Sequence, residues 1–285
     1  MEQRDGHILS IRGLGVCYGD VQAVCDFTLD VQPGEIVGLV GESGSGKSTV
    51  LRAVAGLLGR SGNVVSGEIR YGGRDIAAMS AKQAAALRGH GIAYVFQDPV
   101  ASLDPMYRIQ SQFDECIRSH GVATGPGMRA LECKLLEDMG FDEPDRVLAS
   151  RPHELSGGMC QRVVLAMSLA CEPELLLADE PTSALDVMSQ KQVTDLLLRI
   201  RDQRGIAMVV VSHNIGAIAQ VADRIGVMYA GRLVEVGRWD QVLRNPVHPY
   251  TRNLIAAVPK GDGSLPQMPV AWRETVPGEG GGDAV

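Results

Sequence analysis

The sequence has few aromatic residues, no long apolar run and no surplus of basic charge. Phenylalanine, tryptophan and tyrosine together make up 4% of the 285 residues. The longest apolar stretches, such as 206–211, fall far short of the roughly 20 residues that a membrane-spanning helix needs. The formal net charge of −7 leaves no broad basic surface for nucleic acid or an anionic membrane. We therefore expect a globular protein without nucleic-acid partners.

The cysteine pattern also excludes several classes of protein. The six cysteines contain no Cys-x-x-Cys pair, and several lie in apolar surroundings. Reduced, buried thiols are therefore favoured over disulfides or a metal site. Residues 1–5 show no apolar stretch of the signal-peptide type. These features together predict a cytosolic protein.

Hydrophobic periodicity predicts alternating strands and helices. Alternation of apolar and polar residues, or short apolar runs, predict strands over 8–18, 23–31, 35–40, 67–71, 92–96, 175–178 and 208–211. Helical spacing predicts helices from Lys47 to about Leu58, after a capping box at Ser80–Gln83, and from Leu185 to a stop at Gly205. Residues 98–170 show only helical spacing and predict an α-helical insertion. The order predicts an α/β fold with a mostly parallel, helix-covered sheet.

A glycine-rich loop follows the third predicted strand and matches the phosphate-loop pattern G-x-x-x-x-G-K-S. Its backbone N–H groups and the helix start behind it favour phosphate binding. Lys47 is predicted to reach the β- and γ-phosphates of ATP, and the Ser48 hydroxyl to bind Mg²⁺. A plain glycine turn would not require the strand–loop–helix context. The predicted nucleotide contacts are Gly41, Glu42, Ser43, Gly44, Ser45, Gly46, Lys47, Ser48 and Thr49.

Two acidic residues close the apolar run 175–178. Asp179 is predicted to hold Mg²⁺ through water, as a cation that dehydrates reluctantly prefers. Glu180 is predicted to act as the general base or to position the attacking water. The alternative is a helix-capping pair before Pro181, which the neighbouring phosphate loop disfavours.

Two further polar residues follow predicted strands. Gln97 comes directly after the strand 92–96 and is predicted to contact both Mg²⁺ and the attacking water. His213 follows the strand 208–211, so it should lie at the carboxyl edge of the sheet, where it could bind the γ-phosphate. Alternatively, Gln97 is an ordinary surface residue and His213 has only a structural role.

The segment Leu155–Arg162, followed by the acidic pair Asp179-Glu180, completes a set of motifs that resembles the ATP-binding cassette (ABC) ATPases between Ile8 and Val258. The resemblance implies a phosphate-loop ATPase core with an antiparallel β subdomain and a helical subdomain. It also implies a head-to-tail dimer, in which one subunit completes the ATP site of the other. On this basis Ser156, Gly157, Gly158 and Gln161 would contact the partner's ATP, Tyr18 would stack on adenine, and Asp186 would lie in the loop that crosses the dimer interface.

Two segments resemble a narrower group, the importer ATPases for oligopeptides, dipeptides and nickel. Asn245–Thr251, with its His-Pro-Tyr sequence, is similar to their tail motif, and Ser102–Pro105 also looks like that group. Met159, Met167 and Cys171 resemble the D-type subunit, which pairs with a distinct F-type subunit. Some peptide importers carry an iron–sulfur cysteine cluster after the tail motif. No cysteine follows Cys171, so we expect no cluster.

The expected domain organisation follows these motifs. It comprises two parts of the ATPase core (1–97 and 171–237), a helical subdomain that carries the signature segment (98–170), a C-terminal extension (238–260) and a disordered tail (261–285).

The expected function is the ATP-hydrolysing, Mg²⁺-dependent subunit of an importer for a peptide, nickel or similar solute. The resemblance implies a second ATPase subunit, two membrane permeases and an external substrate-binding protein, with the chain peripheral on the cytoplasmic face of the membrane. The main alternative is a scaffold ATPase in a soluble complex of the carbon–phosphorus lyase type. A small-molecule kinase would leave Ser156–Gly158 unexplained.

Overall fold

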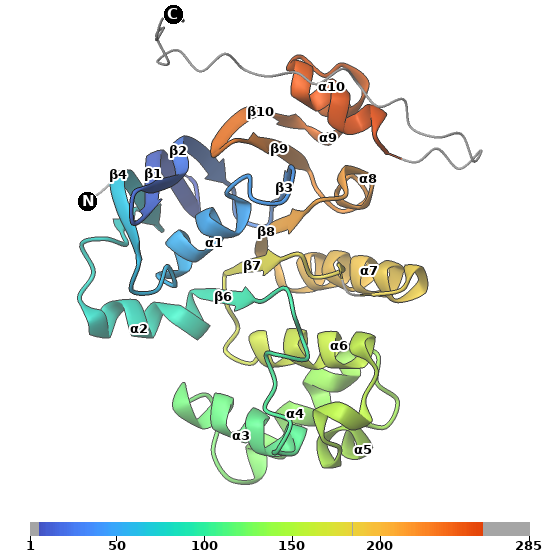
Figure 1. The fold of residues 1–285 in the computed structure, drawn as a ribbon. Helices are drawn as coiled ribbons and strands as arrows, with labels where there is room; N and C mark the ends of the chain where they lie inside the picture. Colours follow the sequence, from blue (N-terminus) through green and yellow to red (C-terminus); the bar gives the residue numbers. More distant parts are fainter. Residues whose placement is uncertain (1–5, 184, 259–285) are drawn as a thin grey trace, which may run out of the picture.

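The computed structural model describes residues 6–183 and 185–258, which fold around two sheets (Figure 1). One sheet has four strands in the order β2-β1-β4-β5, and the other has six in the order β10-β9-β3-β8-β7-β6. Within the described residues, no helix combines the length and the apolar character that a membrane crossing requires.

The four-stranded sheet is antiparallel and formed by the N-terminal part of the chain. Two long strands pair in a hairpin whose buried positions, such as Leu14, Val16 and Phe27, face the core. Glycine and polar residues join the strands in tight turns. The strands are β1 (Leu9–Tyr18), β2 (Val21–Val31), β4 (Gly62–Tyr71) and β5 (Arg74–Asp75).

The six-stranded sheet is parallel except for its edge strand β10. Its central strands are buried on both faces, which explains their uninterrupted apolar runs. Alternate residues of β3 contact different cores, with Val37 and Leu39 facing the four-stranded sheet and Val40 the other side. The strands are β3 (Ile36–Val40), β6 (Ile92–Val95), β7 (Leu175–Asp179), β8 (Ala207–Ser212), β9 (Arg224–Tyr229) and β10 (Arg232–Arg238).

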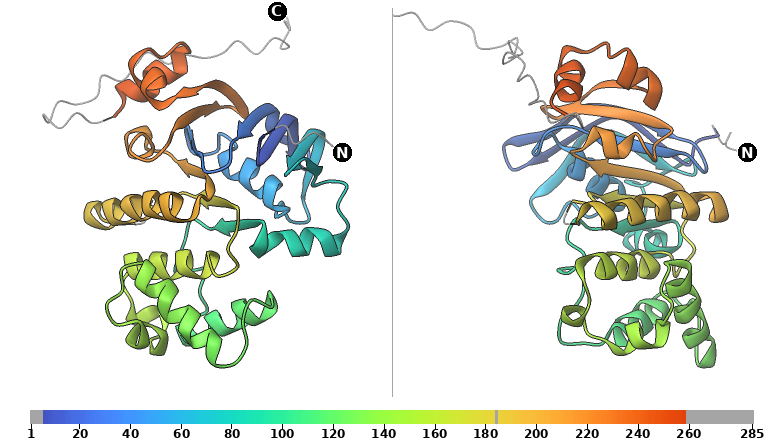
Figure 2. Two further views of the ribbon diagram at one scale, coloured as in Figure 1. Left: turned by 180° about the vertical axis from the view of Figure 1, so that it is seen from behind. Right: turned by 90° about the vertical axis from the view of Figure 1, so that its right-hand side faces the viewer.

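Helices cover the large sheet on both faces. Helix α1 (Lys47–Ala55) packs between the two sheets, where Val50, Leu51 and Val54 join the same apolar core as β1 and β2. Figure 2 shows the layers from two further directions. The other helices around the sheets are α2 (Ala81–His90), α7 (Val187–Arg204), α8 (Ile215–Ile218), α9 (Trp239–Arg244) and α10 (Pro249–Ala256).

A separate group of helices lies beyond β6 (Figure 1). The chain leaves the sheet after β6 and returns to it at β7. Between these strands it forms α3 (Ile109–Ser119), α4 (Pro126–Asp138), α5 (Pro144–Ala149), a short 3₁₀ turn (Pro152–Glu154) and α6 (Gly157–Ser168). Buried Phe113, Leu136 and Leu165 connect this layer to the core on one side of the large sheet.

The predicted α/β fold is confirmed, although strands β5, β9 and β10 were not predicted, and the largest boundary differences are at two elements. The first helix ends at Ala55, three residues before the predicted Leu58, because Gly56 adopts a left-handed conformation (φ 68°) and caps it. Strand β4 starts at Gly62, before the predicted start at Gly67, because its mostly exposed first half has no apolar pattern and is held by pairing with β1. All six cysteines are free. The predicted disordered tail, 261–285, lies outside the described residues.

One buried carboxylate makes the stability of the helical layer depend on pH. Glu132 in α4 is 0% exposed, and burial, followed by the nearby Asp114 carboxylate, raises its pKa to about 7. The unfolded chain has the ordinary value near ~4.3. A raised carboxyl pKa means that the folded state holds a proton that the unfolded state releases. The contribution of Glu132 to the free energy of unfolding therefore falls as the pH rises from ~4.3 to about 7.

We therefore expect Glu132→Gln to stabilise the protein more at pH 8 than at pH 5. Scanning calorimetry should show a melting temperature about 2–6 °C above wild type at pH 8, equivalent to ~1–2 kcal/mol. Glu137→Gln, on the exposed face of the same helix, is the control and should show no such pH dependence. An equal effect of Glu132→Gln on the melting temperature at both pH values would contradict the raised pKa of Glu132.

Candidate nucleotide site

The phosphate loop joins the buried strand β3 to the start of α1. Lys47 is 4% exposed, and its ammonium group donates to the carbonyl oxygens of Gly41 (2.8 Å) and Glu42 (2.7 Å). Burial lowers the pKa of Lys47, while the Glu180 and Asp179 carboxylates act in the opposite direction. Residues 42–44 are exposed, so the loop presents its backbone to solvent while its lysine is held below.

Gly41 is required at the start of this loop. Its φ is 152°, and a Cβ added there would lie 2.1 Å from the carbonyl oxygen of Met228 in β9. A larger residue would therefore push the loop away from the sheet.

Ser48 and Asp179 meet at the carboxyl edge of the large sheet. The Ser48 hydroxyl donates to Asp179 Oδ1 (2.7 Å), and the Tyr94 hydroxyl donates to Asp179 Oδ2 (2.9 Å). Asp179 is 1% exposed. Tyr94 was not predicted from the sequence, because its position on β6 looks like that of any strand residue. Only the pairing of β6 with β7 brings it to the carboxylate.

Glu180 is held by both of the other predicted residues. Gln97 Nε2 donates to Glu180 Oε2 (3.0 Å), and His213 Nδ1 lies 3.2 Å from the same oxygen. Glu180 also has a left-handed backbone conformation (φ 47°), which is uncommon for a residue with a side chain and typical of functional sites. Its N–H donates to the carbonyl of Val211 in β8 (3.0 Å), which anchors this conformation. The structure thus brings Gln97, Glu180 and His213 together.

The signature segment lies on a different element from the phosphate loop. Ser156 caps α6, with its hydroxyl accepting from Met159 N (3.2 Å), and Ser156 and Gly157 are exposed at the helix start. Gly158 lies beside Ser189 of α7. Gln161 is 1% exposed, so its side chain packs inside the helical layer, away from that exposed helix start.

Two further predicted contacts have their own local roles in the structure. Asp186 caps α7 by accepting from the N–H groups of Met188 and Ser189 (3.0 Å each). Tyr18 ends β1 in the four-stranded sheet, where its ring lies against Gly62. Their contacts with a nucleotide remain predictions, as does that of Thr49.

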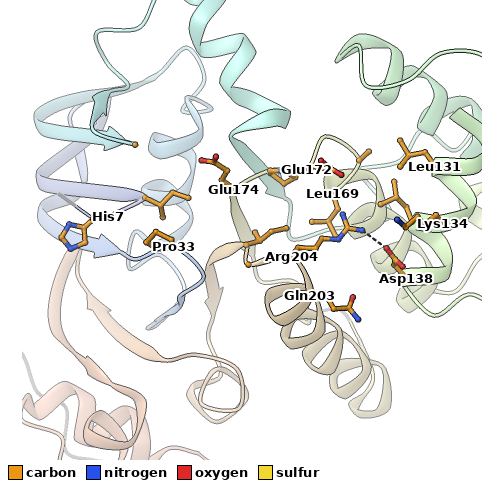
Figure 3. Close-up of a pocket in the computed structure, with 18 residues that line it drawn as sticks. His7, Pro33, Leu131, Lys134, Asp138, Leu169, Glu172, Glu174, Gln203 and Arg204 are labelled. Carbon is orange, nitrogen blue, oxygen red and sulfur yellow. Dashed lines mark hydrogen bonds and ion pairs between the residues drawn. The ribbon is translucent and has the colours of Figure 1, made fainter. Parts of the chain in front are cut away.

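A cavity of about 1010 Å³ opens at the opposite edge of the large sheet (Figure 3). It is lined by residues that precede β3, β7 and β8, including Pro33, Glu174 and Ile206, and by α4. Arg204 forms an ion pair with Asp138 across it (2.7 Å). Because the phosphate loop follows the other end of β3, this cavity is separate from the nucleotide site.

The arrangement of the loop, Asp179 and Glu180 agrees with the comparison with known families. The family model described as "ABC transporter" matches residues 24–183. The chain belongs to this family. A second model, described as "Oligopeptide/dipeptide transporter, C-terminal region", matches residues 234–279. The predicted family and the fold of its cassette are confirmed, and as a member of this family the chain is an ATPase.

Several known proteins are similar over most of the chain. The peptidoglycan transport ATP-binding protein YejF of Agrobacterium fabrum is 42% identical over 90% of this chain, which spans 48% of that protein. The dipeptide transport ATP-binding protein DppD of Escherichia coli is 40% identical over 89% of this chain and 79% of its own length. The solved dimer of the ATP-binding cassette MJ0796, in a post-hydrolysis state with ADP and Pi, superposes with a TM-score of 0.71 at 26% identity, covering 81% of this chain and 98% of that one.

The position of Lys47 leads to a first test of the cassette. Lys47→Ala should weaken ATP binding about 10- to 100-fold, because hydrogen bonds to a charged group contribute ~1.5–3 kcal/mol. Isothermal titration calorimetry measures the dissociation constant directly. Lys82→Ala, which removes an exposed lysine from α2, should bind ATP as the wild type does. Equal affinity in the two variants would exclude Lys47 as a phosphate contact.

Proposed function

We propose that this chain is the ATP-hydrolysing subunit of a membrane importer for peptides or a similar small solute. The observation that carries the hydrolytic part is the convergence of Gln97 and His213 on one oxygen of Glu180. The C-terminal region that matches oligopeptide and dipeptide transporters supports the importer part. The names of YejF and DppD favour transport over a scaffold role in a soluble complex.

The geometry explains how water would be activated. Glu180 accepts hydrogen bonds through Oε2, which leaves Oε1 to accept a proton or a hydrogen bond from water. The water oxygen attacks the γ-phosphorus, the bond to the β-phosphate oxygen breaks, and ADP leaves with the released electron pair. His213 is 59% exposed on its side chain, so it can turn toward the γ-phosphate. Lys47 stabilises the negative charge on the phosphates.

The residues present fit Mg²⁺ as the ion that accompanies ATP. Asp179 is buried but, among the described residues, accepts hydrogen bonds only from the neutral hydroxyls of Ser48 and Tyr94 and forms no ion pair. A buried carboxylate beside a second carboxylate, Glu180, favours a cation. We assign Ser48, Asp179 (through water) and the Gln97 oxygen to hold the ion, since Mg²⁺ prefers oxygen ligands. The ion supplies charge stabilisation for phosphoryl transfer.

The exposed start of α6 supports a two-subunit ATP site. Ser156 and Gly157 are exposed at the start of α6, and the N–H groups of a helix start attract phosphate. They belong to α6 and not to the loop before α1, and we propose that they serve the ATP of a second cassette. We propose that this second cassette is a non-identical subunit of the F type, with this chain as the D type. Gln161 is left out of this contact because it is buried.

An exposed apolar patch marks the surface that meets the permeases. Phe96, Val100, Met106 and Tyr107 are 44%, 49%, 76% and 59% exposed. They lie in the segment that connects β6 to α3 and that contains Gln97, so a permease bound there would sense the position of the nucleotide site. We propose two membrane permeases, an external substrate-binding protein, and a peripheral position on the cytoplasmic face of the membrane.

Replacing the water-positioning carboxylate should separate binding from hydrolysis. Glu180→Gln should bind MgATP with nearly wild-type affinity but hydrolyse it at least about 10²-fold more slowly, because the amide cannot accept the water proton. The trapped ATP should hold the cassettes together, which size-exclusion chromatography with light scattering would detect. Asp202→Asn, an exposed carboxylate at the end of α7, is the control. Wild-type turnover in Glu180→Gln would refute the role of Glu180.

The apolar patch predicts a variant that uncouples the subunit from its membrane partners. Met106→Asp should leave ATP hydrolysis unchanged in the absence of permeases but abolish co-purification with the proposed permeases. Val65→Asp, at a 56% exposed position on β4, is the matched control and should still co-purify. Normal co-purification of Met106→Asp would contradict the role of the patch, whereas a stable soluble complex that lacks any permease would contradict the importer assignment.

A further inference from the structure

The His-Pro-Tyr segment is buried against the phosphate loop. Tyr250, in the first turn of α10, is 5% exposed, and its ring packs on Tyr229 of β9 with the ring centroids 4.4 Å apart. Its hydroxyl accepts a hydrogen bond from the N–H of Glu42, in the phosphate loop (2.9 Å). Figure 1 shows α10 beside the β9–β10 hairpin. Tyr250 follows Glu42 by 208 positions in the sequence and yet contacts the phosphate loop.

The rest of the motif holds this tyrosine in place. The carboxylate of Glu235 in β10 accepts the N–H groups of Val247 and His248 (2.9 Å each). The ring nitrogen Nδ1 of His248 accepts the N–H of Tyr250 (3.2 Å), which caps α10. These hydrogen bonds therefore attach the His-Pro-Tyr segment to β10. These side-chain-to-backbone bonds and the packing of the ring on Tyr229 fix the position of the hydroxyl.

The contacted peptide group is held from both ends. The carbonyl of Gly41 and the N–H of Glu42 belong to one peptide unit, and every peptide bond in the described chain is trans. In a trans unit these two groups point in opposite directions. Tyr250 binds the N–H, and the Lys47 ammonium binds the carbonyl at 2.8 Å. Because Gly41 has no side chain to restrict rotation, the orientation of this unit depends on these two bonds.

We propose that Tyr250 is a positioning residue for ATP binding, whose hydroxyl orients the Gly41–Glu42 peptide and thereby holds Lys47 and the phosphate loop ready for the nucleotide. The inference deepens the proposed ATP-hydrolysing function and rests on it. A second bond supports it, because Gly231, in the β9–β10 turn that follows Tyr229, donates to the carbonyl of Ser45 (3.1 Å). The C-terminal part of the chain therefore holds the loop at two points.

Preorganisation of the phosphate loop has a specific consequence for the binding of ATP. A loop that is already ordered loses less conformational entropy when ATP binds, so the gain is in affinity. Tyr250 contacts neither Glu180 nor the attacking water, so the chemical step should be unaffected. Burial also raises the pKa of Tyr250, so the hydroxyl keeps its proton across the neutral and mildly alkaline range.

The test removes one oxygen atom. Tyr250→Phe keeps the ring on Tyr229 but loses the bond to Glu42, and should raise the KM and the dissociation constant for ATP about 3- to 10-fold, the range for one hydrogen bond. The value of kcat should stay within about twofold. Tyr71→Phe is the matched control. It removes a hydroxyl that bonds the Gly91 carbonyl and Glu174 far from the loop, and should change only thermal stability.

A second measurement does not depend on nucleotide. In the protein without ATP, amide hydrogen exchange at Glu42 should be faster in Tyr250→Phe than in wild type and unchanged in Tyr71→Phe. Unchanged exchange together with an unchanged KM would overturn the proposal and show that Tyr250 only packs α10. Failure of the proposed function gives a different result, namely wild-type protein that does not hydrolyse ATP even with its partner cassette, in which case the exchange data alone decide the role of Tyr250.

Discussion

The parallel pairing of β3, β8 and β7 is the constraint on which the site depends. Strands that run in the same direction end at the same edge, and here Val40 pairs with Ser212 while Asp179 pairs with Val211. The loops that follow these strands must therefore meet. A one-residue shift of register would turn alternate side chains to the other face and separate the phosphate loop from Asp179. The apolar cores on both faces of the sheet prevent such a shift.

Charge at this edge is arranged to be completed by a ligand. Lys47 is buried against backbone carbonyls, and burial lowers its pKa while Glu180 and Asp179 counteract this effect. Asp179 is buried as well and accepts bonds from hydroxyl groups. Both charges are more costly to hold in a dry site than in water. The proposed triphosphate with its cation would place further opposite charge beside both groups, at the side where the loop residues 42–44 are open to solvent.

The molecule carries its functional surfaces on separate layers. Glu180, the proposed water-positioning residue, lies at the sheet edge, the exposed start of α6 lies on the helical layer, and the segment 96–107 with its exposed apolar residues joins the two. Gln97 belongs to both the site and the loop, so a change at Glu180 can reach the helical layer through a single side chain. On the other side, Tyr250 connects the C-terminal helix to the phosphate loop. The proposed roles of these layers follow from their chemistry and exposure.

The sequence by itself determined the fold class, most of the strands and helices as far as β8, and the phosphate loop with its lysine, because hydrophobic period and glycine spacing are local properties. It also indicated Gln97, Glu180 and His213, since each follows an apolar strand. Only the tertiary structure decided that all three meet at one oxygen, that Tyr94 binds Asp179, that Gln161 is buried, and that Tyr250 reaches Glu42. These contacts depend on strand order and helix packing, which join residues far apart in the chain and leave no periodic signal.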